Sequence, residues 1–310
     1  MIIEPSWIGI DIGKFHLDVF DNGRTFRLDN DEEGIAELMA RLAARKVSVV
    51  FEATGVYDRK LRRALQAETI RFERVNPRKA RQFAEAAGFL AKADHLDPRM
   101  LAAMGRAIST VKTTPITPED EDRQHLADLH RRRDQLVAMR KQERARLVDA
   151  PEYLRADLEA HIAWLDQAIR DIERRCREAV LASDEFRRRD EIIRSAPGIG
   201  PVAATTLIAL MPELGQRSPK IIAALAGLAP FNAESGQFRG KRRIKNGRRR
   251  VRDALYMSAV TAARSYPRFR TFYRRLVDAG KPPKVAIIAL ARKLLVILNA
   301  MLRTQTLFQA

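Results

Sequence analysis

The sequence contains one cysteine, no long uncharged apolar run and too few acids to balance its bases. The lone Cys176 excludes an internal disulfide and a cysteine-rich zinc site, and it suits a reducing cytoplasm. No charge-free apolar run reaches the roughly 18 residues that a membrane span needs. Glu4, Pro5 and Asp11 interrupt the apolar start, so we expect no signal peptide. A cytoplasmic protein without a membrane partner is therefore expected.

The deficit of acids indicates a polyanionic partner. The 310 residues carry 57 Lys and Arg against 39 Asp and Glu, which gives a formal net charge of +18. Nucleic acid is the simplest partner that this charge favours. An anionic membrane surface is the competing interpretation, and the missing apolar run disfavours it. The five histidines show no HxxxH spacing, so we rank them below the acids as metal ligands.

The first 112 residues alternate short strands with helices. The pattern predicts strands over 7–12, 16–20, 24–28, 47–52 and 70–75, and helices over 31–45, 56–67 and 78–87. Asp21, Asn22 and Gly23 predict a tight hairpin turn between the second and third strands. We therefore expect an α/β domain with a mixed sheet flanked by helices, in the element order of the ribonuclease H fold.

Four carboxylates in this part have positions that suit a metal site. Asp11 alternates with Ile8, Ile10 and Ile12, so its side chain points away from the Ile row. Glu52 ends a β-branched run, at the carboxyl edge where α/β sheets bind ligands. Asp94 and Asp97 follow in AKADHLDPRML, on either side of His95. Oxygen ligands of this kind suit Mg²⁺ or Mn²⁺, and a pair of such ions can hold a phosphate during phosphodiester chemistry.

Each acid also has an ordinary structural interpretation. Asp11 could flank a turn, Glu52 could be an exposed strand end, and Asp94 could simply be solvated. Asp97 precedes Pro98, and proline is favoured as the first residue of a helix, so Asp97 is an N-cap candidate. Both interpretations of each acid stay open at this point.

The middle of the chain predicts a helical spacer. The segment TTPITPEDED reads as a linker, and almost no Gly or Pro occurs between about 119 and 190. Apolar residues then recur at alternating spacings of four and three, as in a coiled-coil seam: Leu158, Ile162, Leu165, Ile169, Ile172 and Cys176. A weaker series comes before Pro151: Leu126, Leu129, Leu136 and Leu147. We expect two antiparallel helices that pair with each other or with another subunit.

The last third combines an apolar turn with a basic run. Gly198, Ile199 and Gly200 form a turn between apolar helices, typical of a helix-hairpin-helix whose amides face a DNA phosphate, although such turns also serve as plain connectors. No acid interrupts the following cations before Asp253: Arg239, Lys241, Arg242, Arg243, Lys245, Arg248, Arg249, Arg250 and Arg252. We expect this run to bind nucleic acid. The final apolar helix is expected to be core, since Arg292 and Lys293 oppose a membrane span.

Six segments occur in a telling order: IGIDIGKFHLDVF, VVFEATGVY, AKADHLDPRMLA, SAPGIGPVAATTL, LAGLAPFNAESGQFRGKRRI and PPKVAIIALARKLL. In this order they resemble the DEDD-type insertion-sequence transposases, relatives of the pilin-gene inverting recombinase. The resemblance implies a RuvC-like nuclease domain over 1–115, a coiled-coil spacer over 116–190, and a mainly helical transposase domain with a helix-hairpin-helix over 191–310. The chain departs from the usual third motif, KTDRIDA, at Ala93, His95 and Pro98.

The resemblance also implies a chemistry and partners. Asp11, Glu52, Asp94 and Asp97 would hold Mg²⁺, and Ser235 would be the nucleophile that forms a transient phosphoserine bond with DNA. Metal coordination can activate such a hydroxyl, Gly236 would permit close approach, and the cations from Arg239 onward would bind the scissile phosphate. Implied partners are the DNA of element ends and target, a noncoding bridge RNA, and further subunits in a dimer or tetramer. A prokaryotic, nucleoid-associated enzyme is expected.

Three other functions remain as alternatives. A RuvC-like Holliday-junction resolvase would use water in place of Ser235, which would then be an ordinary turn residue. A sugar-kinase-like or chaperone-like ATPase would share the IGIDIGK motif, but a second Asp-Gly strand motif and a Gly-rich adenosine site are missing from the sequence. A purely architectural DNA-binding protein would explain the positive charge and leave the acids unexplained.

Overall fold

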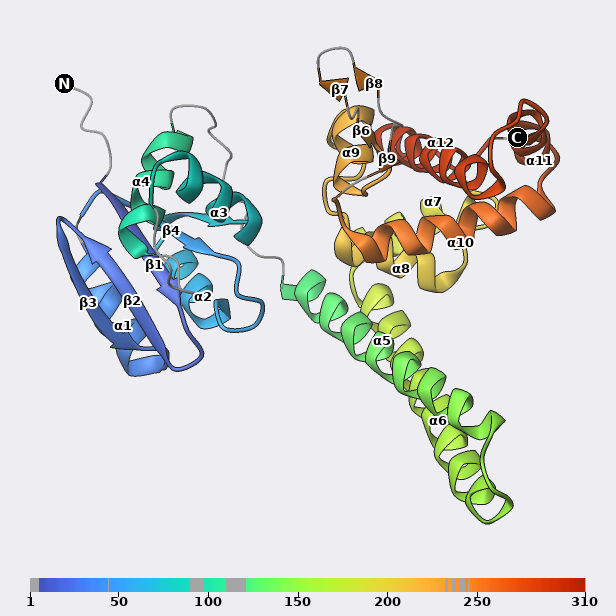
Figure 1. Ribbon diagram of the computed structural model, residues 1–310, viewed down its shortest axis with the longest axis horizontal. Coiled ribbons are helices and arrows are strands. Elements are labelled where there is room, and N and C mark those ends of the chain that lie inside the picture. Colours follow the sequence, from blue (N-terminus) through green and yellow to red (C-terminus); the bar gives the residue numbers. More distant parts are fainter. Residues whose placement is uncertain are drawn as a thin grey trace. The chain divides into compact units, whose positions relative to one another are not determined.

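The computed structural model describes residues 6–43, 45–89, 97–109, 121–231, 234–235, 238–239, 243–244 and 246–309 (Figure 1). Residues 108–109, 231–239 and 243 are described, where at all, by their backbone alone. The chain divides into two compact units, Met1–Pro118 and Glu119–Ala310, and each unit has apolar clusters of its own.

The first unit is built on a five-stranded mixed sheet. Its strands are β1 (Ser6–Ile12), β2 (His16–Asp21), β3 (Arg24–Asp29), β4 (Val47–Glu52) and β5 (Arg71–Val75), in the order β3-β2-β1-β4-β5. β1, β2 and β3 are antiparallel, whereas β4 runs parallel to β1 and β5. Asn22 and Gly23 both have positive φ, as a type I′ hairpin turn requires. All five predicted strands and the predicted turn are confirmed.

Helices bury both faces of this sheet. Ile8, Ile10 and Ile12 project into the apolar cluster that includes residues of α1 (Glu32–Leu42) and α2 (Arg59–Ala67). Trp7 and Val50 project the other way, into a cluster with α3 (Pro77–Ala86) and α4 (Pro98–Ser109). The alternation along β1 therefore places odd-numbered residues, Asp11 among them, on the face that α4 covers.

The second unit begins with a long antiparallel helical hairpin, seen in green in Figure 1. Its helices are α5 (Glu121–Val148) and α6 (Glu152–Ala182), and Pro151 precedes α6 as predicted. The seam is buried at Leu165, Ile169, Ile172 and Cys176, whereas Leu158 and Ile162 are only partly buried. These buried residues share one apolar cluster with Leu126, Leu129 and Leu136 of α5. The sequence left open whether the two helices pair with each other or with another subunit. In the structure α5 and α6 pair with each other.

The rest of the second unit is mainly helical and continues the same apolar cluster. Its helices are α7 (Asp184–Ser195), α8 (Pro201–Leu210), α9 (Pro219–Leu225), α10 (Arg249–Ser265), α11 (Pro267–Asp278) and α12 (Pro283–Thr304). Short strand pairs lie between α9 and α10: β6 (Pro230–Phe231) with β9 (Arg243–Ile244), and β7 (Glu234–Ser235) with β8 (Phe238–Arg239).

The final helix α12 is the core helix that the sequence predicts. Among the described residues it is the one helix long and apolar enough to cross a membrane by length and composition. Leu290, Leu294 and Leu298 are nevertheless fully buried inside the unit, within the apolar cluster shared with α5 to α11. The burial of its apolar face by other helices explains its composition.

Candidate functional site

Asp11 and Glu52 lie next to each other at the carboxyl edge of the sheet. Ile10 pairs with Phe51 across the parallel strands β1 and β4, so the following residue of each strand is one of the two acids. Both acids alternate onto the face that carries Trp7 and Val50. The predicted orientation of Asp11, away from the Ile row, is confirmed.

The two carboxylates repel each other. Partial burial raises the pKa of Glu52, and the negative charge of Asp11 raises it further, while the positive charge of Arg81 on α3 opposes the rise. A pair of neighbouring hard oxygen donors that repel each other suits a divalent cation of the Mg²⁺ class. The donor set therefore fits the metal that the sequence predicts.

Helix α4 begins directly over β1 because Gly9 has no side chain. A Cβ atom at Gly9 would overlap the carbonyl oxygen of Pro98 and crowd the amide nitrogen of Ala102. Asp97 comes immediately before this contact, and its Oδ1 accepts a hydrogen bond from the Arg99 amide at 2.8 Å. Asp97 thus caps α4, as the structural interpretation of this residue predicts, and the same contact brings the start of α4 to the face of Asp11.

The described residues hold only part of the predicted acidic set. Asp94 and His95 lie outside the described residues. Within the described ranges, no three His, Cys, Asp or Glu side chains are close enough to hold one ion. Asp11 and Glu52 form the described pair, and the metal-binding roles of Asp94 and Asp97 stay predictions.

Ser235 lies in the other unit, on a short β-hairpin. β7 and β8 pair Ser235 with Phe238 and Glu234 with Arg239, so the serine directly precedes the hairpin's connection. Gly236, Lys241, Arg242 and Lys245 lie outside the described residues. The roles of Ser235, Arg239 and Arg243 in catalysis or DNA binding stay predictions.

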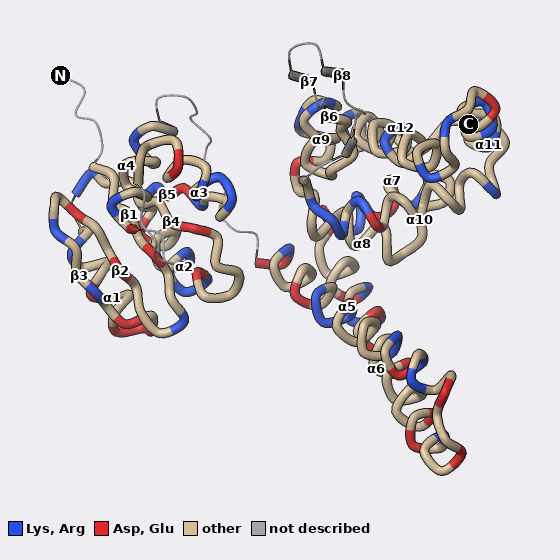
Figure 2. Tube along the Cα trace, viewed as in Figure 1, with Lys and Arg blue, Asp and Glu red and all other residues tan. Residues whose placement is uncertain are grey.

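The basic run continues into α10, where Figure 2 shows a cluster of Lys and Arg. Arg248 is held by Glu213 through two hydrogen bonds of 2.6 Å, and Arg250 forms an ion pair with Asp134 at 2.9 Å. Arg249 forms a longer and more exposed ion pair with Asp253. These arginines therefore also stabilise the start of α10, and their predicted binding to nucleic acid has to be tested against that role.

The two glycines of the predicted helix-hairpin-helix differ in their surroundings. Gly198 has a φ of +83°, and a Cβ atom there would overlap the Ser258 carbonyl oxygen of α10. Gly200 is the N-cap of α8, and no heavy atom lies within 4 Å of the position that its Cβ would take. Packing against α10 therefore explains Gly198, whereas the open space at Gly200 leaves room for the predicted phosphate.

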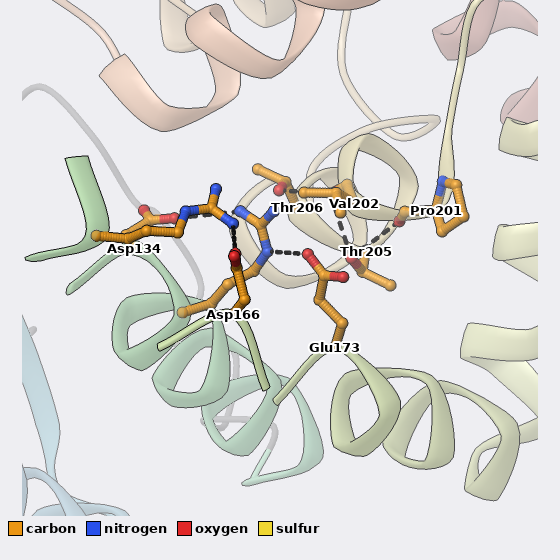
Figure 3. A network of polar contacts seen from close by, with 9 residues as sticks. Asp134, Asp166, Glu173, Pro201, Val202, Thr205 and Thr206 are labelled. Atoms are coloured by element: carbon orange, nitrogen blue, oxygen red, sulfur yellow. Dashed lines mark hydrogen bonds and ion pairs between the residues drawn. The ribbon is translucent and has the colours of Figure 1, made fainter. Parts of the chain in front are cut away.

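Polar contacts join the helical hairpin near the first turn of α8 (Figure 3). Glu173 on α6 accepts a hydrogen bond from Arg133 Nε of α5 at 2.7 Å, and Arg140 of α5 bonds to Asp166. Two cavities of about 660 and 690 Å³ lie in this region and share His130, Arg133, Pro201 and Val202 in their walls. Gly198, Gly200 and Arg250 line the smaller one. The base of the hairpin thus forms one polar region with the glycine turn.

Some residues at the carboxyl edge were not predicted from the sequence. Asn30 follows β3, and its side chain donates hydrogen bonds to the carbonyl oxygens of Gly13 and Tyr57. Phe15 and Tyr57 are exposed at the same edge, each shortly after one of the acids. The sequence signal for Phe15 and Tyr57 is that each aromatic residue comes a few positions after one of the two acids.

Two family models match successive parts of the chain. The DEDD transposase model of IS110 elements matches residues 8–150, and the model described as the IS116/IS110/IS902 transposase family matches residues 190–274. The chain carries the transposase domains of this family. The first model covers the acidic site of the transposase, and the second covers its glycine turn.

Curated relatives agree with this assignment. The transposase is 27% identical to the pilin gene-inverting protein of Moraxella lacunata and 28% identical to that of Moraxella bovis, with 97% of each chain covered. It is 36% identical over 154 residues to the 44.8 kDa protein of insertion element IS116 from Streptomyces clavuligerus, which covers 49% of this chain and 38% of that protein. The transposase is therefore a DNA-recombining enzyme, and its DEDD domain indicates dependence on a divalent metal.

Proposed function

We propose that this transposase is a metal-dependent serine recombinase that cuts and exchanges DNA strands during transposition. The observation that carries the proposal is the carboxylate pair Asp11 and Glu52 at the carboxyl edge of the sheet, inside the DEDD match. Asp94 and Asp97 would complete the ligand set for Mg²⁺ or Mn²⁺. A ribonuclease H-like or RuvC-like fold for residues 1–115 is supported by the three antiparallel strands that precede two parallel ones.

Ser235 is the proposed nucleophile. Its hydroxyl oxygen bonds to the scissile phosphorus as the bond between that phosphorus and a deoxyribose oxygen breaks. The hydroxyl proton is lost to solvent and the released deoxyribose oxygen gains one, which leaves a phosphoserine diester and a free DNA end. A divalent ion held by the acids would, when bound, stabilise the charge that develops on the phosphate oxygens.

Arginines and lysines would hold the nucleic acids. The cations from Arg239 to Arg250 would contact the DNA backbone near Ser235, and the amides at Gly200 would face a phosphate at the start of α8. A bridge RNA that selects the site by base pairing would need mainly such backbone contacts, which the net charge of +18 favours. Dimers or tetramers would bring the serine of one subunit to the acids of another, with residues 116–190 as the spacer.

The covalent intermediate gives the direct test of this proposal. DNA carrying the element end would be incubated with the full-length enzyme and Mg²⁺, and the protein–DNA adduct would be mapped by mass spectrometry. We expect the adduct on Ser235, its loss in Ser235→Ala and in Glu52→Gln, and its retention in Ser218→Ala. Ser218 is a suitable control because it is exposed in the same unit and its side chain makes no capping bond.

Two outcomes would contradict the serine mechanism. Ser235→Ala could still cleave DNA without forming an adduct, in a reaction that requires the metal-site carboxylates. That result would assign the enzyme to the alternative, a resolvase that uses water. An adduct mapped to Tyr256, Tyr266 or Tyr273 would replace the serine by a tyrosine nucleophile.

A further inference from the structure

Two aromatic side chains are displayed at the carboxyl edge that holds Asp11 and Glu52. Phe15, in the connection between β1 and β2, is 71% exposed, and Tyr57, in the connection after β4, is 42% exposed. Each connection begins within a few residues of one of the acids. Large apolar side chains in water usually mark a binding surface when they are grouped and held in place.

Asn30 holds both connections. Its Nδ2 donates to the Gly13 carbonyl oxygen at 2.9 Å and to the Tyr57 carbonyl oxygen at 3.1 Å. Its backbone amide donates to the Phe15 carbonyl oxygen at 2.9 Å. One residue therefore ties the backbones that carry both aromatic rings, so the two rings are displayed on a fixed frame.

A buried ion pair fixes the Tyr57 connection from its other side. Asp58 is fully buried, and its carboxylate accepts hydrogen bonds from Arg62 Nε at 3.0 Å and from Arg74 Nε at 2.6 Å. Tyr57 thus lies between two anchors, the amide of Asn30 and the carboxylate of Asp58. The exposure of Tyr57 is therefore a consequence of a rigid backbone and not of a loose loop.

Positive charges accompany the aromatic rings. Lys14 Nζ lies 4.7 Å from the centroid of the Phe15 ring, and α2 begins with Arg59 and Lys60 directly after Asp58. Arg81 of α3 is close enough to Glu52 to influence its pKa. Exposed aromatic rings among cations are the combination that binds single-stranded nucleic acid, because the rings stack on bases while the cations hold phosphates.

We propose that Phe15 and Tyr57 form a stacking platform for unpaired DNA bases that flank the scissile phosphate, and that Asn30 is the residue that positions the platform. The inference rests on the proposed function, because the acids at the same edge place the scissile phosphate there. DNA is the occupant favoured here over a bridge RNA or a protein, since the platform adjoins the carboxylates that act on DNA.

Fluorescence of a single strand that contains 2-aminopurine tests the platform without any cleavage. Full-length enzyme would be titrated onto the strand in EDTA, and stacking would quench the fluorescence of the base. We expect Phe15→Ala and Tyr57→Ala each to abolish most of the quenching and to weaken binding about 5- to 150-fold, the equivalent of one lost stacked base. Tyr57→Phe is expected to keep the quenching, because the ring and not the hydroxyl stacks. Tyr153 is an exposed aromatic residue of the other unit, so Tyr153→Ala is the control and is expected to behave as the wild type.

Asn30→Asp tests the positioning role at nearly constant shape, since it removes the amide donor of Asn30. We expect quenching to fall as in Tyr57→Ala, while the salt dependence of binding, which reports phosphate contacts, stays as in the wild type. Circular dichroism would show that the variant is folded. Asn30→Asp with unchanged quenching would remove the positioning role.

Four results would overturn the platform itself. Alanine at both aromatic positions could leave quenching unchanged, or Tyr153→Ala could reduce it equally. An RNA strand that binds more tightly than DNA and depends on the same rings would assign the platform to a guide RNA. A change of oligomeric state in light scattering with intact quenching would make the surface a contact between subunits. Ser235→Ala is expected to quench normally, so failure of the serine mechanism and failure of the platform are distinguishable.

Discussion

Acidification should destabilise the helical unit through one buried histidine. His130 of α5 is 3% exposed, and its Nε2 has no hydrogen-bond partner among the described residues. Burial, together with the positive charges of Arg133 and Arg250, lowers the pKa of His130 to about 4. Asp134 adjoins both arginines, and the pKa of the nearby Cys176 thiol is raised to about 11, so the thiol stays neutral in this range.

The sign and size of the effect follow from the two pKa values. An unfolded histidine titrates near 6.5, so between that pH and 4 the unfolded chain holds a proton that the folded chain excludes. Stability is therefore fully present above pH 6.5 and is lost as the pH falls toward 4. The pKa difference corresponds to about 3 kcal/mol of unfolding free energy at most. This is a large fraction of the stability of an ordinary domain.

Urea unfolding of the full chain, followed by circular dichroism, measures this effect. Between pH 7 and pH 4 the wild type should lose about 3 kcal/mol more than His130→Gln, which has no group to protonate. His125→Gln is the matched control, because His125 is exposed on the same helix. The NMR titration of the His130 imidazole should have its midpoint near 4. Parallel pH profiles for the wild type and His130→Gln, or a midpoint at or above 6.5, would refute the reasoning.

Three further predictions concern the acidic site and the helix beside it. Gly9→Ala should push α4 away from β1 and lower the unfolding free energy by about 1–3 kcal/mol. Gly200→Ala is the control, because its new methyl group meets no neighbour and should lower the unfolding free energy less. Thermal unfolding of the two variants measures the difference. Because burial and Asp11 raise the pKa of Glu52, cleavage and Mg²⁺ affinity should rise with pH through a range above that of ordinary glutamates. A flat pH profile of Mg²⁺ affinity would contradict the role of the raised Glu52 pKa. Chelation of the metal should stop cleavage and leave 2-aminopurine quenching intact.

The sheet of the first unit was predictable because its signals are local. Alternation of Ile8, Ile10 and Ile12 with Gly9 and Asp11 sets which face is buried, and Asn22 with Gly23 sets the hairpin turn. The position of Glu52 at the carboxyl edge also followed from the end of its β-branched run, whereas its place beside Asp11 comes from the pairing of β1 with β4. The approach of α4 to β1 was not predictable, because the clash that makes Gly9 necessary involves Pro98, far away in sequence.

The helical hairpin shows where a periodic pattern stops being informative. Spacings of four and three predicted two antiparallel helices, yet the same pattern occurs at Leu158, only partly buried, and at Leu165, fully buried. Burial depends on what faces each residue, and at the base of the hairpin α6 faces both α5 and the helices that follow. The glycine turn gave a similar ambiguity, because sequence alone does not separate Gly198, which packs on α10, from Gly200, which is open.

The two interpretations of Asp97 turn out to be compatible. Capping α4 uses Oδ1, which accepts the Arg99 amide, and an ionised carboxylate has further lone pairs on its second oxygen. The start of α4 packs on Gly9 of the strand that carries Asp11, and it fixes the orientation of the Asp97 carboxylate. A fixed carboxylate loses less side-chain entropy on binding an ion than a freely rotating one does. In the proposed metal site the cap would therefore hold Asp97 in place. Pro98, one of the three departures from the usual family motif, favours the cap because proline is preorganised for the first helical position.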